Sequence, residues 1–373
     1  MNTSQEKEPA LGKTLLDDVR HVGFFSQLKL EWGEIGDFYI SEEKRDRLMK
    51  MNRFKRWVVL SWWIIKAMFL RLTPFRRILL IVGVVFVASV RFSVTTNGGA
   101  SHVSYDGAPL VGLAILLLVL ALELKDKLLA RSELQAGRAV QRAMHPEQSP
   151  VIPGWNLWLF TRPANEVGGD LVDFMHLNGD RYGIAIGDVS GKGLGAALLM
   201  VKIQATLRAL APDYPSLPSF IGKLNQILSR DRIPGSFTSL IFLSLTTASD
   251  RIRYVNAGHM RPLLVSGADA NELPKGDVAL GLASDTTYTE QELNLTQGQC
   301  LVLYSDGIVE AQNNAGEFFG LERFKSLCAT MGTLSAQGLG ERAVATVEDF
   351  IGNARGTDDL SLVIIQRSTV GGR

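Results

Sequence analysis

Beyond residue 150, apolar residues recur in short alternating runs, and this pattern predicts a domain rich in β-strands. Longer stretches with helical spacing interrupt the runs twice, at 193–211 and 218–230 and again at 319–331 and 335–352. Strands in runs with helices in blocks predict an α+β fold in which sheets pack on each other and helices lie outside. The predicted strands are 155–162, 171–177, 182–186, 237–245, 251–256, 262–265, 292–295, 300–304 and 360–366.

Two strongly apolar segments, 78–90 and 108–122, stand out in the first half of the chain. With the first extended to Val94 and the second taken as 105–124, each approaches the roughly 20 residues that span a bilayer core. Basic residues flank the pair on both outer sides, which predicts a transmembrane helical hairpin with a short external loop and both outer ends in the cytoplasm. The alternatives are a buried helical pair in a soluble domain and a single true span. The flanking residues are Arg71, Arg76, Arg77, Lys125, Lys127 and Arg131.

Residues 44–77 combine Lys and Arg with Trp57, Trp62, Trp63 and other large apolar side chains. A basic helix that carries indole rings is typical of a membrane interface, where cations meet anionic lipid headgroups. The alternative is an amphipathic helix that packs on protein. We therefore expect residues 57–124 to form an interfacial helix and a two-helix anchor in the inner (cytoplasmic) membrane. Residues 1–56 form a cytoplasmic segment without a recognisable role, and they lack the pattern of a secretory signal.

The segment 123–144 is charged, with Leu124, Leu128, Leu134 and Val140 at spacings of roughly one or two helical turns. This pattern predicts a helical linker over residues 125–150, and its apolar seam favours a coiled coil that pairs two chains into a homodimer. Pro146, Pro150 and Pro153 follow the linker, and proline interrupts helices. We place the start of the next domain at residue 151, so that this domain covers residues 151–373.

The overall charge and the cysteines exclude several classes of protein. The formal net charge is +1, so no basic field suggests a nucleic-acid partner. Cys300 and Cys328 are the two cysteines, and both lie in apolar segments without the spacing of metal ligands. We expect buried free thiols and no disulfide, which fits a cytoplasmic location for this part of the chain.

Glycine-flanked aspartates stand at the ends of predicted strands, and they indicate a metal site. Residues 171–177 and 182–186, joined by a turn at Asn178-Gly179-Asp180, have the pattern of a β-hairpin that brings Asp170 and Asp188 together. One Asp-Gly pair alone is an ordinary turn, but Asp306 and the pair Asp358-Asp359 repeat the arrangement. A set of carboxylates without His or Cys suits Mg²⁺ or Mn²⁺, and their mutual repulsion favours two ions.

These aspartates lie within motifs that resemble the SpoIIE-like bacterial serine phosphatases, a branch of the metal-dependent type 2C phosphatase superfamily. The motifs are EVGGDLVDF, GDVSGKGLGAALLM, NAGH, LYSDGIVEA and DDLSLVII, which begin at residues 166, 187, 256, 303 and 358. The resemblance covers roughly residues 134–366. It implies a type 2C-like sandwich of two packed antiparallel β-sheets flanked by helices. It also implies hydrolysis of phosphoserine or phosphothreonine by a metal-activated water, on a phosphorylated regulator of the anti-anti-sigma or partner-switching kind.

The resemblance also implies roles for individual residues, with Asp188 and Asp170 at the catalytic centre. Asp188 resembles the residue that bridges both metals, while Asp170 and the carbonyl of Val189 would complete one metal site. Asp306 and Asp358 would hold the other ion. Either of two neighbouring carboxylates can point inward at the last position, so Asp359 stays an alternative to Asp358.

Besides Asp359, four residues are candidates for outer positions around the ligands or for contacts with substrate phosphate. Glu166 and Asp173 are the outer acidic candidates. Lys192 lies in a Gly-Lys-Gly turn, where glycine amides at a helix start can bind anions, but the remaining residues of a nucleotide-binding loop are absent. Arg162 is a candidate phosphate clamp, although an arginine at a strand end is more often part of a surface ion pair.

Other interpretations of the motifs remain open at this stage. His259 is either a proton donor or, more commonly for a histidine in a turn, a hydrogen-bonded structural residue. Gly168-Gly169-Asp170 resembles part of the GGDEF signature of nucleotide cyclases, but Leu171 and Val172 replace its Glu and Phe. A catalytically weak, metal-binding docking module at the membrane is the main alternative function.

Overall fold

The computed structural model describes residues 48, 51–89, 92–97, 100–105, 108–144, 149–231, 235–354, 356 and 358–368. Most of the predicted segment 1–56 therefore lies outside the described residues. The contacts divide the chain into two compact units, one ending at Leu128 and the other beginning at Leu129. The division falls within helix α6 (Ala108–Met144), which contributes residues to both units.

The second unit contains two five-stranded sheets, in which every pair of neighbouring strands is antiparallel. The first sheet consists, in spatial order, of β10 (Gln291–Asn294), β7 (Arg251–Ala257), β6 (Thr238–Thr246), β5 (Arg181–Val189) and β4 (Leu171–His176). The second consists of β3 (Trp155–Arg162), β12 (Leu360–Arg367), β11 (Gln299–Tyr304), β8 (Leu263–Ser266) and β9 (Asp269–Glu272). The predicted α+β class with packed antiparallel sheets is confirmed.

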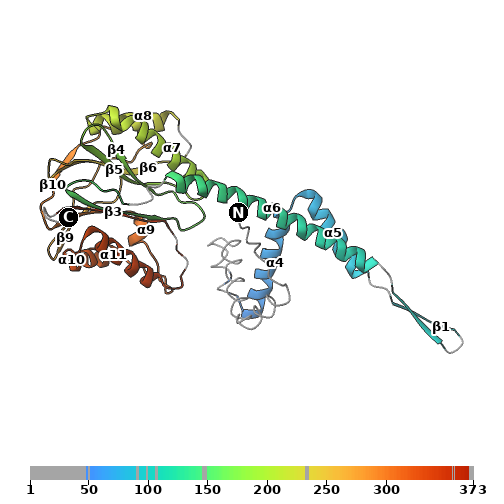
Figure 1. Ribbon diagram of the computed structural model, residues 1–373. Coiled ribbons are helices and arrows are strands. Elements are labelled where there is room, and N and C mark those ends of the chain that lie inside the picture. Colours follow the sequence, from blue (N-terminus) through green and yellow to red (C-terminus); the bar gives the residue numbers. More distant parts are fainter. Residues whose placement is uncertain are drawn as a thin grey trace, which may run out of the picture. The chain divides into compact units, whose positions relative to one another are not determined.

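Helices cover the outer face of each sheet (Figure 1). The helices α7 (Leu194–Leu210) and α8 (Leu217–Arg230) lie against the first sheet, joined by the short 3₁₀ helix η1 (Ala211–Asp213). The helices α10 (Leu321–Thr330) and α11 (Ala336–Ile351) lie against the second sheet, and α9 (Asp306–Val309) is a single turn after β11. The layers of this unit therefore follow the order helices, sheet, sheet, helices.

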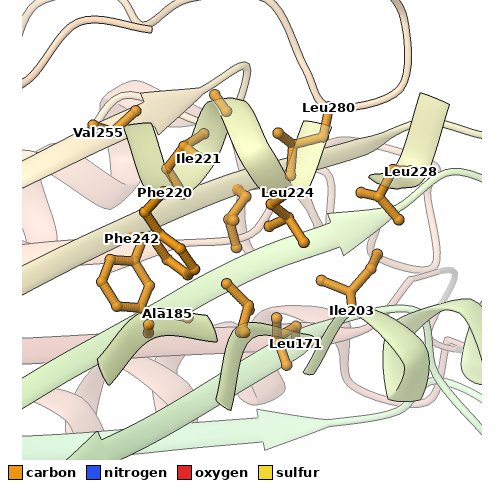
Figure 2. Close-up of a cluster of buried hydrophobic side chains, with 14 of the residues drawn as sticks. Leu171, Ala185, Ile203, Phe220, Ile221, Leu224, Leu228, Phe242, Val255 and Leu280 are labelled. Carbon is orange, nitrogen blue, oxygen red and sulfur yellow. The ribbon is translucent and has the colours of Figure 1, made fainter. Parts of the chain in front are cut away.

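Alternation along the strands separates three apolar cores. On β5, Ile184 and Ile186 point between the sheets, whereas Ala185 points toward α7 and α8. Figure 2 shows Phe220 of α8 against Phe242 of β6 in this outer core. The core between the sheets is made mainly of aliphatic side chains from both, with Trp155 and Tyr254 among them, and each fully buried Leu or Ile contributes about 2 kcal/mol to stability. This period-two burial is the physical reason why the strands are recognisable in the sequence.

Every predicted strand and helix of this domain is present, with ends that shift by no more than three residues. The short elements β9, α9 and η1 were not predicted, because β9 and α9 have only four residues each, η1 has three, and none shows a clear alternation of apolar and polar residues. Cys300 and Cys328 are both free and buried, which confirms that prediction.

The first unit differs from the prediction in how its helices are divided. The basic segment 44–77 does not form one helix: α4 (Arg53–Arg71) ends before Pro74, and Pro74 begins α5 (Pro74–Ala88). Proline lacks the N–H that a continuing helix needs, so it is favoured at a helix start. The polar segment between the apolar stretches contains β1 (Phe92–Asn97) paired with β2 (Ala100–Tyr105) instead of an irregular loop. The charged linker is not a separate helix either, because it continues the second apolar stretch within α6.

The helices α5 and α6 approach each other closely at two glycines. A Cβ atom on Gly112 would lie 2.7 Å from the carbonyl oxygen of Gly83, and one on Gly83 would lie 2.9 Å from Leu116. Close approach at small residues is typical of helices that pack within a bilayer. Near the basic end of the pair, Arg76 donates to Glu123 at 2.6 Å and to Asp126 at 2.7 Å.

Among the described residues, two helical stretches are long and apolar enough to cross a membrane, α6 and Leu194–Asp213. The second stretch is a core helix, because Met200, Ile203 and Leu207 are fully buried against the first sheet. The apolar part of α6 instead leaves large side chains such as Leu110 and Leu117 exposed. Since α5 has only 15 residues, fewer than the roughly 20 of a full span, the two-span anchor stays a prediction.

Candidate active site

Asp170 and Asp188 lie side by side at one end of the first sheet. In the β4–β5 hairpin, Leu171 pairs with Gly187, so the residues immediately outside that pair, Asp170 and Asp188, stand opposite each other. The turn at residues 178–180 sets this register, and the predicted approach of the two carboxylates is confirmed. Asp170 is buried, and its Oδ2 atom has no hydrogen-bond partner.

The second sheet brings two more aspartates to the same site. Asp306 follows β11 and begins α9, while Asp358 precedes β12, and these two strands pair directly with each other. The Ser305 hydroxyl donates to the carbonyl oxygen of Asp359 at 3.1 Å, and the Ser361 amide donates to the Ser305 hydroxyl at 3.0 Å. These bonds hold the start of β12 against the end of β11, so both acidic segments have fixed positions.

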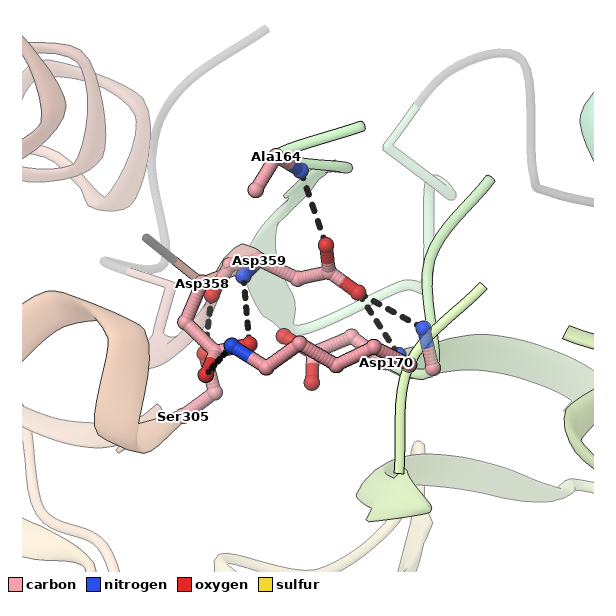
Figure 3. A network of polar contacts seen from close by, with 7 residues as sticks. Ala164, Asp170, Ser305, Asp358 and Asp359 are labelled. Carbon is pink, nitrogen blue, oxygen red and sulfur yellow. Dashed lines mark hydrogen bonds and ion pairs between the residues drawn. The ribbon is translucent and has the colours of Figure 1, made fainter. Parts of the chain in front are cut away.

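Asp359 joins the two sheets, because its carboxylate binds the loop that leads to Asp170 (Figure 3). Its Oδ1 atom accepts from the Ala164 amide at 2.8 Å, and its Oδ2 atom accepts from the amides of Gly169 at 2.7 Å and Asp170 at 3.3 Å. A Cβ atom on Gly168 would lie 2.3 Å from Oδ2, so only glycine fits beside this carboxylate. Asp359 therefore acts as a clamp on the loop, with both carboxylate oxygens already engaged.

Asp358 points the other way, toward the start of α7. Its Oδ2 atom forms an ion pair with Lys192 Nζ at 2.9 Å, and its Oδ1 atom accepts from the Asp359 amide at 3.0 Å. Both side chains are partly exposed. Asp358 and Asp359 thus make different contacts, Asp358 with Lys192 and Asp359 with the loop before Asp170, and the sequence alone did not distinguish them.

The carboxylates of the site strongly disfavour one another's charge. Burial, followed by the charge of Asp306, raises the pKa of Asp188 to about 7. Burial also raises the pKa of Asp170 well above its usual range, an effect that the nearby Ser361 and Ser305 hydroxyls oppose and the charge of Asp188 increases. Asp306 likewise has a raised pKa, because of burial and the nearby charge of Asp358. Carboxyl groups with raised pKa values, such as these three, readily bind protons or cations.

The arrangement fits a hard divalent cation in its chemistry. The donors are carboxylate and carbonyl oxygens, the ligands that Mg²⁺ and Mn²⁺ prefer. A Cβ atom on Gly169 would lie 3.0 Å from the Val189 carbonyl and 3.4 Å from Asp188 Oδ1, so these two oxygens converge on one small space. Within the described parts of the chain, no three acidic, histidine or cysteine side chains already meet closely enough to hold an ion. Binding therefore requires small shifts of the side chains, the Asp358 carboxylate included.

The outer candidates are engaged in ion pairs away from the carboxylates. Glu166 accepts from Arg138 of α6 at 2.9 Å. The fully buried carboxylate of Asp173 binds Arg208 of α7 through two bonds of 2.6 and 2.9 Å, which is a structural role. Arg162 pairs with Glu348 of α11.

His259 is buried and supports the fold. Its Nδ1 atom lies 2.8 Å from the Ser239 hydroxyl, and its amide donates to the Asn256 side chain at 2.8 Å.

Sequence analysis did not predict the contributions of Ser305, Ser361 and Gln141 to the site. Ser305 precedes Asp306 within a motif, but its contacts depend on the pairing of two distant strands. No local signal identifies them.

The fold defines the class to which this protein belongs. The SiaA-PP2C domain of Pseudomonas aeruginosa superposes on it with a TM-score of 0.58 and 19% sequence identity, covering 65% of this chain and 98% of that domain. At this identity the likeness establishes the fold alone, a type 2C phosphatase fold.

The family follows from the sequence of the same region. The profile described as Stage II sporulation protein E (SpoIIE) matches residues 178–368, and the chain belongs to this family. Protein IcfG of Synechocystis sp. is 26% identical over 284 residues, which cover 67% of this chain. Phosphoserine phosphatase RsbU of Bacillus subtilis is 26% identical over 243 residues, which cover 64% of it. The matches span 44% of the length of IcfG and 70% of RsbU.

Proposed function

We propose that this chain is a metal-dependent protein phosphatase that hydrolyses phosphoserine or phosphothreonine on a regulatory protein. The observation that carries the proposal is the gathering of four aspartates from two sheets at one end of the sandwich. They are Asp170, Asp188, Asp306 and Asp358. The ion pair with Lys192 compensates the charge of Asp358 alone. Burial and mutual repulsion of the other three carboxylates cost stability, and binding of cations explains the arrangement.

The proposed cofactors are two Mn²⁺ or Mg²⁺ ions. Asp170, Asp188 and the Val189 carbonyl would hold one ion, and Asp188, Asp306 and Asp358 the other. When bound, such ions activate a water molecule toward phosphorus and neutralise the phosphoryl oxygens. We assign the last position to Asp358 and not to its neighbour, because both carboxylate oxygens of Asp359 already accept backbone hydrogen bonds.

The remaining residues of the site position the ligands and the substrate. Asp359 fixes the loop that carries Asp170, and Ser305 fixes the start of β12. Lys192 and Arg162 lie at the exposed rim of the site, each in an ion pair with a carboxylate. A phosphate dianion is a stronger partner for either cation than a single carboxylate, so both are candidates for the phosphate contact.

The relatives support a phosphoprotein substrate. RsbU bears the name phosphoserine phosphatase and shares 26% of aligned residues with this chain. We propose the same reaction here, on a small phosphorylated regulator of a partner-switching or anti-anti-sigma pathway.

We further propose that residues 57–124 anchor the protein in the inner membrane, with the segment 1–56 and the domain 151–373 in the cytoplasm and lipid as a partner. The exposed apolar side chains of α5 and α6, among them Ile78, Ile81, Leu110 and Leu117, support this proposal. Extraction of membranes at high pH tests it. The chain is expected to stay in the membrane fraction, and release into the soluble fraction would contradict the anchor.

The end of α6 provides a physical link to the site, and we propose that the linker pairs two chains and transmits a signal through it. The buried Gln141 side chain donates to the Gly168 carbonyl at 2.8 Å and accepts from the Gly168 amide at 3.2 Å. Gln204 and Arg208 of α7 both donate to the carbonyl of Met144. Sedimentation of the full chain in detergent tests the dimer, because a chain without residues 123–144 should then be monomeric.

A phosphatase assay with purified full chain tests the central proposal. We expect Mn²⁺-dependent release of phosphate from a phosphoserine peptide and at least a hundredfold loss in the Asp188→Asn variant. Asp269→Asn, on the exposed strand β9, is the matched control. Tight Mn²⁺ binding without any turnover would instead identify the alternative, a metal-binding docking module.

A further inference from the structure

Two cavities of the second unit share lining residues, and together they are called the groove here. The first, of about 350 Å³, lies between the end of α6 and strand β3, and the second, of about 390 Å³, includes Asp358 and Gly307. Arg162 and Pro163 line both cavities. The groove therefore runs from α6, past Arg162, to the proposed metal site.

Arginine and apolar side chains together line the first cavity. Arg138, Arg142 and Arg162 line it together with Leu159, Phe160 and Val172. Arg138 and Arg162 are neutralised by Glu166 and Glu348. Arg142 is exposed, and no carboxylate within the described residues pairs with it. A ligand for this surface combines negative charge with apolar side chains.

The groove also suits an extended polypeptide. Strand β3 is at the edge of the second sheet, with β12 as its only neighbour among the described strands. The residues that line the first cavity, 159–162, are the last residues of this edge strand. An edge strand offers backbone groups to which an extended segment can bind, while the side chains on either side provide specificity.

We propose that this groove binds the segment of the phosphoprotein substrate that flanks its phosphoserine, with acidic residues of the substrate on Arg142 and Arg138. The phosphoserine itself would then lie beside Asp358, at the other end. This inference rests on the proposed phosphatase function and adds a substrate class, namely phosphoserine within an acidic and partly apolar sequence.

Synthetic phosphoserine peptides of equal length test the inference with the full chain and Mn²⁺. One set carries Glu at the flanking positions, another Gln and a third Lys, on either side of the phosphoserine. The readout is kcat/KM for each peptide divided by kcat/KM for p-nitrophenyl phosphate, which is too small to reach the groove. We expect the Glu peptides to exceed the Gln peptides by about fivefold, and the Lys peptides to fall below both.

Charge reversal at Arg142 provides the sharper comparison. Arg142→Glu should remove the preference for Glu peptides and improve the Lys peptides by a similar factor. Arg131→Glu is the matched control, because Arg131 is exposed on the same helix, outside the groove and about 16 Å along the axis. That variant should keep the preference of the wild type.

The outcomes separate the inference from the function on which it rests. Turnover with no dependence on flanking charge, or equal effects of Arg142→Glu and Arg131→Glu, would overturn the groove and leave the phosphatase intact. If no substrate is hydrolysed, the phosphatase proposal fails. Fluorescence anisotropy with a labelled Glu peptide then decides on the groove: weaker binding in Arg142→Glu than in Arg131→Glu supports it, and equal binding overturns it.

Discussion

Lys192 Nζ lies 2.9 Å from Oδ2 of Asp358, so the turn before α7 and the segment before β12 are held together by one ion pair. The same carboxylate is a proposed metal ligand. A lysine ammonium and a divalent cation cannot both occupy the best position on one carboxylate oxygen. We therefore expect Lys192 to compete with the proposed metal and, once displaced, to present its ammonium group at the rim of the site.

Removing the Lys192 charge should strengthen metal binding. We expect Lys192→Met to bind Mn²⁺ about two- to fivefold more tightly in calorimetric titrations, because the ion no longer displaces a partly exposed ion pair. Lys202→Met is the matched control, since Lys202 of α7 forms an equally short pair with Asp231, at 2.9 Å. Equal or weaker Mn²⁺ binding in Lys192→Met than in this control would show that the pair does not compete with the metal.

Metal binding should depend on pH through Asp188. The pKa of this carboxyl is about 7, so it carries a proton in the metal-free protein at lower pH, and a cation must displace that proton. We expect the affinity for Mn²⁺ to fall about tenfold for each pH unit below 7. Titrations in buffers with different ionisation enthalpies measure the released proton directly. A constant affinity between pH 5.5 and 7 would contradict the assignment of Asp188 as a ligand.

His259 should make the stability of the second unit depend on pH in the acidic range. Burial lowers the pKa of this histidine to about 4, although a hydrogen bond with the Tyr304 backbone opposes the shift. Between pH 4 and 6.5 the unfolded chain thus binds a proton that the folded protein does not. The contribution of neutral His259 is complete above pH 6.5 and is lost as the pH falls toward 4.

Chemical denaturation of residues 129–373 checks this effect, since that unit has its own cores. The difference in unfolding free energy between wild type and His259→Gln should shrink by about 2–3 kcal/mol from pH 7 to pH 4. His176→Gln is the control, because His176 is exposed. A difference that stays constant across this range would refute the prediction.

The glycine beside Asp359 should tolerate no side chain. Gly168→Ala places a methyl group 2.3 Å from Asp359 Oδ2, and we expect it to lower the unfolding free energy by about 1–3 kcal/mol and to reduce activity. Gly195→Ala meets no atom within 4 Å and lies in α7, so it should be neutral or raise stability by up to about 1 kcal/mol. Thermal or denaturant unfolding of both variants measures the difference.

Local patterns account for the parts of the site that could be predicted. Asp170 and Asp188 were brought together by a turn and two alternating strands, all within about twenty residues. The division of labour between Asp358 and Asp359 was not predictable, because it depends on backbone amides of residues 164–170, nearly two hundred positions away. Asp173 was predicted as an outer residue of the site because its partner Arg208, on a helix that folds back over the strand, could not be identified from the local sequence.

The continuity of α6 was missed for a different reason. Its composition changes from apolar to charged near Glu123, and such a change usually marks the end of an element. A helix can continue through such a change of composition, because its hydrogen bonds join backbone groups and do not depend on the polarity of the side chains. The change of composition therefore does not mark the end of α6.

The clamp formed by Asp359 implies an order of assembly. This residue precedes β12, the last strand, which inserts between β3 and β11 and therefore pairs with chain made long before it. During synthesis, Gln141 is available to hold Gly168, but the loop that carries Asp170 lacks its hydrogen bonds to Asp359 until residue 359 has emerged and β12 has docked. Contacts over such long separations form late in folding. A partly synthesised chain thus lacks this clamp, so we expect the proposed phosphatase activity only after the whole sandwich has closed.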